Sequence, residues 1–152
     1  DIMPRVIRRC CEIKTEIVSK DEKDRGLRKI LNFGHTIGHA LEGITDFSKY
    51  AHGEAVIIGM YYETIIAKKL GIVDKEYAEE ILSFLNSLEV DLNIDSYSFP
   101  GLVEWMSKDK KNVGGKISFI LPVGRGTVGE QLLEKDEILH LHSEFTNIIT
   151  PR

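Results

Sequence analysis

The chain has little of several features that would assign it to a broad class of protein. Its only two cysteines, Cys10 and Cys11, are adjacent, and adjacent cysteines rarely bridge, so a disulfide framework is excluded. No apolar run approaches the roughly 20 residues that a helix needs to cross a bilayer. The formal net charge is −4, which gives no support for binding nucleic acid. We therefore expect a protein of a reducing, cytoplasmic setting, without nucleic-acid or membrane partners.

The beginning of the chain is also uninformative about export. It lacks the basic and then apolar pattern of a secretory signal. It starts at Asp1, without a methionine, inside a segment whose pattern predicts a helix, so we expect a piece of a longer protein. No glycine-rich phosphate fingerprint follows a predicted strand, so we expect no cofactor-binding residues for a dinucleotide in this chain. Its length suits one domain over residues 1–152.

Apolar residues recur mostly at spacings of three and four, the period of an amphipathic helix. The spacing predicts a helix over Pro4–Lys20 and a charged loop over Asp21–Gly26. A second helix is predicted to begin near Leu27 or Asn32 and to run to about Glu42, with Gly43 as its stop. Further helices are expected over Ala55–Leu70, Lys75–Leu88, Phe99–Met106 and Asp136–Ile148.

One segment changes to the alternating pattern of β-structure. Lys116–Leu121 and Thr127–Leu132 predict two strands, joined by a turn over Pro122–Gly126. The fold class is therefore mainly α, with one small β-hairpin.

The densest group of chemically active side chains is a histidine cluster. His35 and His39 are four residues apart and share one face of a helix, and His52 follows after a short loop. Three imidazoles suit a catalytic Zn²⁺ with an open position, and Glu42 and Glu54 are nearby oxygen donors. The plainer interpretation is a polar helix face. His140 and His142 have no flanking ligand pattern, and we expect them to be structural or solvated.

Basic residues form two weaker groups. Lys14 lies near the apolar stripe of the first helix, and Arg28 and Asn32 precede His35 by seven and three residues. Such a set can bind carboxylate and phosphate oxygens. Lys110 and Lys111 stand in a loop that is followed by two glycines and that can close over a phosphate. In both groups the alternative is an ordinary solvated surface.

The longest recognisable motif is Leu31–Glu42, with the sequence LNFGHTIGHALE, and His52–Val56, with the sequence HGEAV, follows it. Together with Ile13–Val18, Asp21–Arg28 and Asp109–Asn112, these segments resemble the 3-dehydroquinate synthase family. The likeness is dense over residues 10–70 and thinner afterwards. Asp24 stands where the family usually has Glu.

The resemblance implies the helix-rich C-terminal domain of the dehydroquinate synthase-like fold, without the N-terminal NAD-binding domain. It implies an NAD- and metal-dependent carbon–oxygen lyase of the shikimate pathway, which leads to chorismate and the aromatic amino acids. Such an enzyme converts 3-deoxy-D-arabino-heptulosonate 7-phosphate to 3-dehydroquinate and phosphate. The expected cofactors are Zn²⁺ or Co²⁺ and NAD, and the full-length protein is expected to be a homodimer.

The resemblance also implies roles for single residues. His35 and His52 would be metal ligands, completed by a glutamate from a segment that precedes the chain. Lys14, Arg28, Asn32 and His39 would be catalytic and substrate-binding residues, with Lys110 or Lys111 at the phosphate. The isolated chain is therefore expected to be inactive.

Three alternatives remain at this point. A related sugar-phosphate cyclase would differ around Lys14, Asp24 and Arg28. A metal-dependent polyol dehydrogenase would need the histidines but no anion-binding set. A regulatory module with a structural zinc would need a fourth ligand, such as Cys10 or Cys11.

Overall fold

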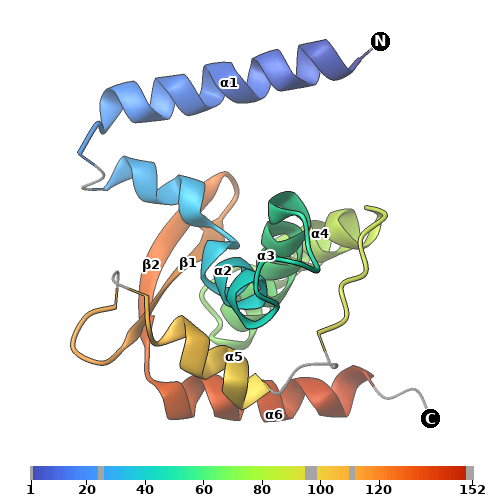
Figure 1. Ribbon diagram of the computed structural model, residues 1–152, viewed down its shortest axis with the longest axis vertical. Helices are drawn as coiled ribbons and strands as arrows, with labels where there is room; N and C mark the ends of the chain where they lie inside the picture. Colours follow the sequence, from blue (N-terminus) through green and yellow to red (C-terminus); the bar gives the residue numbers. More distant parts are fainter. Residues whose placement is uncertain (1, 24–25, 95–98, 110–111, 150–152) are drawn as a thin grey trace. The chain divides into compact units, whose positions relative to one another are not determined.

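The computed structural model describes residues 2–23, 26–94, 99–109 and 112–149. Its order of elements is α1 (Met3–Lys20), η1 (Leu27–Asn32), α2 (His35–Ile44), α3 (His52–Lys69), α4 (Lys75–Asn86), α5 (Phe99–Met106), β1 (Ile117–Gly124), β2 (Thr127–Leu133) and α6 (Lys135–Ile149). The predicted class, mainly α with one hairpin, is confirmed (Figure 1). Within the described residues, no helix is both long and apolar enough to span a bilayer.

The chain divides into two compact units. The N-terminal unit, residues 1–32, contains α1 and the 3₁₀ helix η1, and the C-terminal unit, residues 33–152, contains all other elements.

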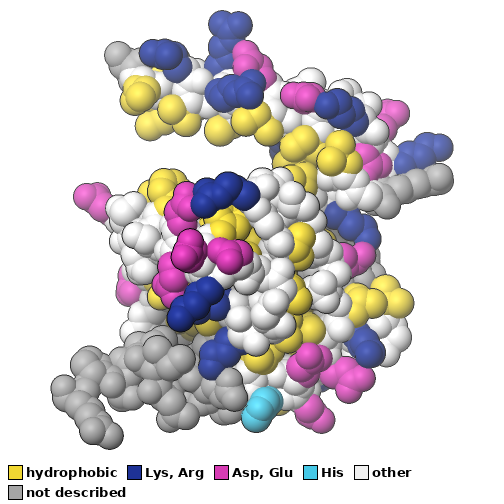
Figure 2. Space-filling view, turned by 180° about the vertical axis from the view of Figure 1, so that it is seen from behind, with side chains coloured by type: hydrophobic (Ala, Val, Ile, Leu, Met, Phe, Trp, Pro, Cys, Tyr) yellow, Lys and Arg dark blue, Asp and Glu magenta, His cyan; other side chains and the backbone are white. Residues whose placement is uncertain are grey.

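The N-terminal unit consists of an amphipathic helix and a short 3₁₀ turn. Hydrophobic side chains gather along one side of α1, with charged side chains along another (Figure 2). Asp21 is the C-cap of this helix, and its carboxylate orders the next segment, because Oδ2 accepts from the backbone N–H groups of Gly26 at 2.8 Å and Arg28 at 3.0 Å. None of the residues of α1 is buried.

The C-terminal unit is built around the packing of α2 on α3. Helix α4 packs on α3, and α5 packs on α2 (Figure 1). Helix α6 packs on α5, and strand β1 of the hairpin packs against α3 and α2. The strands pair antiparallel, from Ile117 opposite Leu133 to Pro122 opposite Val128, with an irregularity between Pro122 and Gly124. One hydrophobic core joins these elements, and it includes Leu41, Ile58 and Phe119.

Glycines allow the two central helices to touch through their backbones. A methyl group on Gly59 would overlap the carbonyl oxygen of Gly34, and one on Gly38 would lie 3.1 Å from the Ala55 carbonyl oxygen. Gly43 packs in the same way against the indole of Trp105. Gly34 and Gly38, four residues apart in the LNFGHTIGHALE motif, therefore permit close packing of α2 on α3.

The second predicted helix is not continuous: the prediction that it begins near Leu27 or Asn32 is wrong. The segment with Arg28 and Asn32 is a 3₁₀ helix, and the α-helix begins only at His35. Gly34 interrupts the two, because its φ of +84° lies in the left-handed region that favours glycine. Arg28 and Asn32 therefore do not share a continuous helix face with His35.

The other differences are small shifts of element boundaries. Gly43 does not stop α2, which continues to Ile44, and this glycine packs against Trp105. Pro122 lies inside β1 rather than in the turn. Helix α3 begins at His52 and not at Ala55, and α4 ends at Asn86.

Candidate metal site

Three histidines converge in the C-terminal unit, as the motif predicts. His35 is the first residue of α2, His39 lies one turn later, and His52 is the first residue of α3. The centroid of the His35 ring lies 5.3 Å from that of His39 and 5.4 Å from that of His52. The ring centroids of His39 and His52 are 6.1 Å apart. Two imidazoles on one tetrahedral Zn²⁺, with Zn–N of about 2.0–2.1 Å, would place their centroids roughly 5 Å apart. The observed spacing fits a shared cation.

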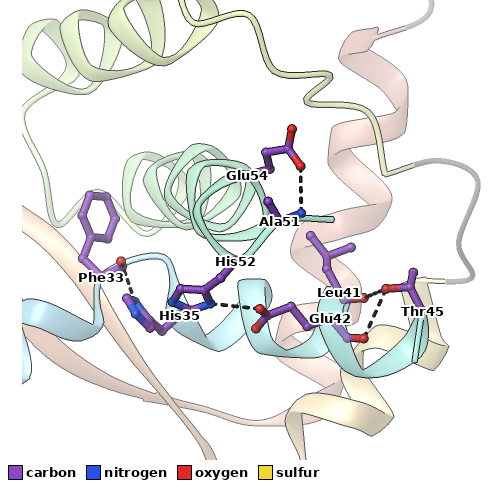
Figure 3. A network of polar contacts seen from close by, with 8 residues as sticks. All are labelled: Phe33, His35, Leu41, Glu42, Thr45, Ala51, His52 and Glu54. Atoms are coloured by element: carbon purple, nitrogen blue, oxygen red, sulfur yellow. Dashed lines mark hydrogen bonds and ion pairs between the residues drawn. The ribbon is translucent and has the colours of Figure 1, made fainter. Parts of the chain in front are cut away.

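Hydrogen bonds orient two of these rings. His35 Nδ1 lies 3.3 Å from the Phe33 carbonyl oxygen, and His52 Nδ1 lies 2.9 Å from Glu42 Oε1 (Figure 3). Both partners are acceptors, so Nδ1 carries the proton in each neutral ring and the lone pair is on Nε2. Histidines that bind a metal through one ring nitrogen usually donate a hydrogen bond from the other nitrogen to a carbonyl or carboxylate oxygen.

Glu42 has two possible roles in this cluster. It is 8% exposed, and its ligand oxygen, with nitrogens of His39 and His52, belongs to a set of atoms that all lie within 4.8 Å of one another. Glu42 would therefore either be a ligand itself or hold the His52 ring. The 2.9 Å contact to Nδ1 favours the second role, because that oxygen is already engaged by the ring.

Local structure fixes the start of the helix that carries His52. The preceding residue, Ala51, has no side-chain oxygen to cap the helix. Glu54 instead accepts a hydrogen bond from the Ala51 backbone N–H at 2.8 Å (Figure 3). Glu54, named from the sequence as an oxygen donor, is thus engaged in capping α3.

The start of α2 is held by a residue that the sequence analysis missed. Glu63 of α3 is 0% exposed, and its two carboxylate oxygens accept from the backbone N–H groups of Gly34 at 2.6 Å and Ile37 at 3.3 Å. Burial raises the pKa of Glu63 to about 8, although the N–H groups of Gly34, Ile37 and Thr36 oppose the shift. A carboxylate in an otherwise apolar stretch of the predicted helix was the available signal.

The remaining candidate residues are distributed differently. Lys14 is exposed on α1, and Arg28 is half-buried and donates from Nη1 to the Glu22 carbonyl oxygen at 3.3 Å. Both belong to the N-terminal unit, as does Asn32, so their approach to the histidines stays a prediction. Lys110, Lys111 and Asp24 lie outside the described residues. His142 stacks on Phe99, with centroids 3.6 Å apart, as expected of a structural residue.

Comparisons with solved structures show that the fold of this chain resembles part of two larger enzymes. It superposes with a TM-score of 0.76 on 2-deoxy-scyllo-inosose synthase, complexed with carbaglucose-6-phosphate, NAD⁺ and Co²⁺, at 23% identity. The same score relates it to 2-epi-5-epi-valiolone synthase from Streptomyces hygroscopicus subsp. jinggangensis 5008, with NAD⁺ and Zn²⁺ bound, at 20% identity. These alignments cover 91% and 94% of this chain and 39% and 40% of those chains.

Comparisons of sequence are more specific. The model of the 3-dehydroquinate synthase C-terminal family matches residues 1–112, and the chain belongs to this family. The 3-dehydroquinate synthase of Alkaliphilus metalliredigens is 54% identical over 137 residues, and that of Caldanaerobacter subterraneus subsp. tengcongensis is 42% identical over 134. These alignments cover 90% and 88% of this chain but only 38% of each relative.

Proposed function

We propose that the chain is the metal- and substrate-binding part of a 3-dehydroquinate synthase, which converts 3-deoxy-D-arabino-heptulosonate 7-phosphate to 3-dehydroquinate and phosphate. The observation that carries the proposal is the convergence of His35 and His52 with both Nδ1 atoms held by oxygen acceptors. Family membership supports the reaction, and the two structurally similar enzymes, which were solved with NAD⁺ and either Co²⁺ or Zn²⁺, support the cofactors.

In this proposal His35 and His52 hold a Zn²⁺ or Co²⁺ ion through Nε2, and a glutamate outside the chain completes the set. Glu42 keeps the His52 ring in the required tautomer. When bound, the metal polarises substrate hydroxyls and lowers their pKa. The NAD site would lie in the part of the protein outside this chain, which spans 38% of the length of these relatives and has no dinucleotide fingerprint after a predicted strand.

The residues proposed to hold the substrate are cationic or polar and suit an acidic sugar phosphate. Lys14 and Arg28 would bind the carboxylate and neighbouring oxygens, where the Arg28 fork gives directional contacts. Asn32, His39 and either Lys110 or Lys111 would bind the phosphate and assist its elimination. The substrate's own phosphate would take the proton beside the oxidised carbon, so these side chains act by fixing conformation and charge.

The same reasoning gives expectations for the whole protein. It would function as a lyase of the shikimate pathway in the cytoplasm and as a homodimer. The chain by itself would be inactive, because the NAD site and one metal ligand lie elsewhere. The test is an assay of phosphate release from the chain with substrate, NAD⁺ and Zn²⁺. Turnover at the rate of a complete synthase would contradict this part of the proposal.

Metal binding can be tested on the chain alone. Titration with Co²⁺, followed by its visible absorption band, measures the affinity. We expect His35→Ala and His52→Ala each to lower the Co²⁺ affinity at least about tenfold. His140→Ala is the matched control, because this histidine is exposed on α6 away from the ligand motif. Equal Co²⁺ affinity in all four proteins would exclude the site.

A second candidate function is cyclisation of another sugar phosphate, which the fold similarity to two other cyclases favours. Polyol dehydrogenation is the third, suggested by the histidine pattern alone. A chimera separates them, in which this chain replaces the 54% identical segment of the Alkaliphilus enzyme. The heptulosonate phosphate should be turned over, whereas glucose 6-phosphate and glycerol should not. The native Alkaliphilus enzyme is the control for the assay, and turnover of glucose 6-phosphate alone would favour the second function.

A further inference from the structure

The helix that carries His35 and His39 begins without local capping. The residue before it, Gly34, has no side chain, and no side-chain oxygen of its own segment caps the first turn. The backbone N–H groups of a first helical turn have no partner inside the helix, and leaving them unpaired in the core is costly. In this chain two N–H groups at the helix start are satisfied by a distant residue: Gly34 N–H donates to Glu63 Oε2 at 2.6 Å and Ile37 N–H to Oε1 at 3.3 Å.

Glu63 holds this turn on both sides of His35. One carboxylate oxygen accepts from Gly34, immediately before the histidine, and the other accepts from Ile37, two residues after it, at 3.3 Å. Between them, Thr36 Oγ1 donates to the Ser118 carbonyl oxygen of β1 at 3.0 Å. The backbone at His35 is therefore tied to α3 and to β1, and the direction of its side chain follows from these ties.

A carboxyl group is an expensive means of holding a helix end. Glu63 is 0% exposed, so its desolvation opposes folding. The positive end of the helix dipole and the N–H donors offset part of that cost. A side chain with a single acceptor oxygen would cost less to bury, but it could not accept from both Gly34 and Ile37. The two-point contact is thus what the carboxyl group specifically provides.

We propose that Glu63 is a positioning residue of the metal site: its two contacts set the first turn of α2 so that the His35 ring faces those of His39 and His52. The inference rests on the proposed metal site for its functional meaning. The part of the inference that concerns the relative orientation of the three imidazole rings does not depend on a metal.

The decisive variant is Glu63→Gln in the full 152-residue chain. It preserves the size of the side chain but turns one acceptor into an NH₂ group facing a backbone N–H. Thr64→Val is the matched control, because Thr64 is equally buried on the same helix and its hydroxyl donates only within α3, to the Met60 carbonyl oxygen at 2.7 Å. Both variants lose one buried polar contact, but only the first disturbs α2.

Two readouts are measured at a temperature at which circular dichroism shows each protein to be folded. The first is the set of imidazole NMR signals and ring-to-ring nuclear Overhauser contacts among His35, His39 and His52, without metal. The second is Co²⁺ affinity. We expect Glu63→Gln to shift the His35 signals and to weaken Co²⁺ binding at least about tenfold, the size typical of residues behind the ligands. Thr64→Val should change neither.

Each other outcome decides the question. Unchanged ring contacts and Co²⁺ affinity in folded Glu63→Gln overturn the proposal. If Glu63→Gln does not fold, Glu63→Asp, which retains both oxygens but is one methylene shorter, must show the same shifts in weaker form. Failure of both variants to fold would assign Glu63 to stability alone and overturn the proposal. If the wild-type chain binds Co²⁺ too weakly to measure, because one proposed ligand lies outside the chain, the ring contacts alone decide the role of Glu63.

Discussion

Helices α1 and α2 both carry residues proposed for the same active site, but their environments differ. In α1, which carries Lys14, none of the residues is buried. In α2, which carries His35 and His39, six of ten residues are buried, and glycines bring the helix into backbone contact with α3. The arrangement of the histidines is thus a product of core packing within one unit. By contrast, the position of Lys14 on α1 is not set by core packing, because α1 has no buried residue.

The largest effect that would test this contrast is expected at Gly59. In Gly59→Ala the new methyl group would overlap the Gly34 carbonyl oxygen, and a backbone atom cannot move away as a flexible side chain can. We expect the unfolding free energy to fall by more than about 4 kcal/mol, a large share of a domain's stability. Urea denaturation measures this loss. Gly53→Ala, where nothing lies within 4 Å, is the control and should be nearly neutral.

The next effect is expected in the core beneath the histidines. Leu41 on α2 is 0% exposed, and Leu41→Ala should cost about 3 kcal/mol through lost burial and a cavity. The measurement is again urea denaturation. A loss below about 1 kcal/mol would mean that α2 is not held by the core as described.

A third prediction concerns pH and the anchor of α2. The pKa of Glu63 is raised from 4.5 to about 8 in the folded chain, so between these values the folded state retains a proton that the unfolded state has released. Raising the pH through this window therefore lowers stability, by up to about 1.4 kcal/mol per pH unit from this group, and the effect ends above pH 8. Urea denaturation at pH 5.5, 6.5 and 7.5 measures the slope. Glu63→Gln should flatten it, and an identical slope in both proteins would contradict the assignment.

The smallest effect is expected on α1. Ile13 is 41% exposed, so Ile13→Ala removes little buried area, and we expect less than about 0.5 kcal/mol. Thermal unfolding followed by circular dichroism checks this. A loss as large as that of Leu41→Ala would show that α1 is packed as tightly as α2, and the contrast would fail.

The sequence was most informative where a signal is periodic or local. Local sequence patterns predicted each α-helix of the described residues, and the alternating pattern predicted the hairpin, with errors mainly at the ends. The histidine cluster also followed from spacing, because residues four apart share a helix face. The break at Gly34 was missed, since glycine is tolerated inside helices and neither its positive φ nor its close contact with α3 leaves a local sequence pattern. Glu63 was missed because its contacts bridge 26 and 29 residues, beyond any local pattern.

The contact between Gly43 and Trp105 has a practical consequence. Trp105 is the chain's single tryptophan, 39% exposed on α5, and its ring lies where a side chain on residue 43 would be. Its fluorescence spectrum therefore reports on the far end of the histidine helix without any label. The protein contains its own optical sensor for whether that helix is docked, and titrations with metal or denaturant can be followed through it at micromolar concentration.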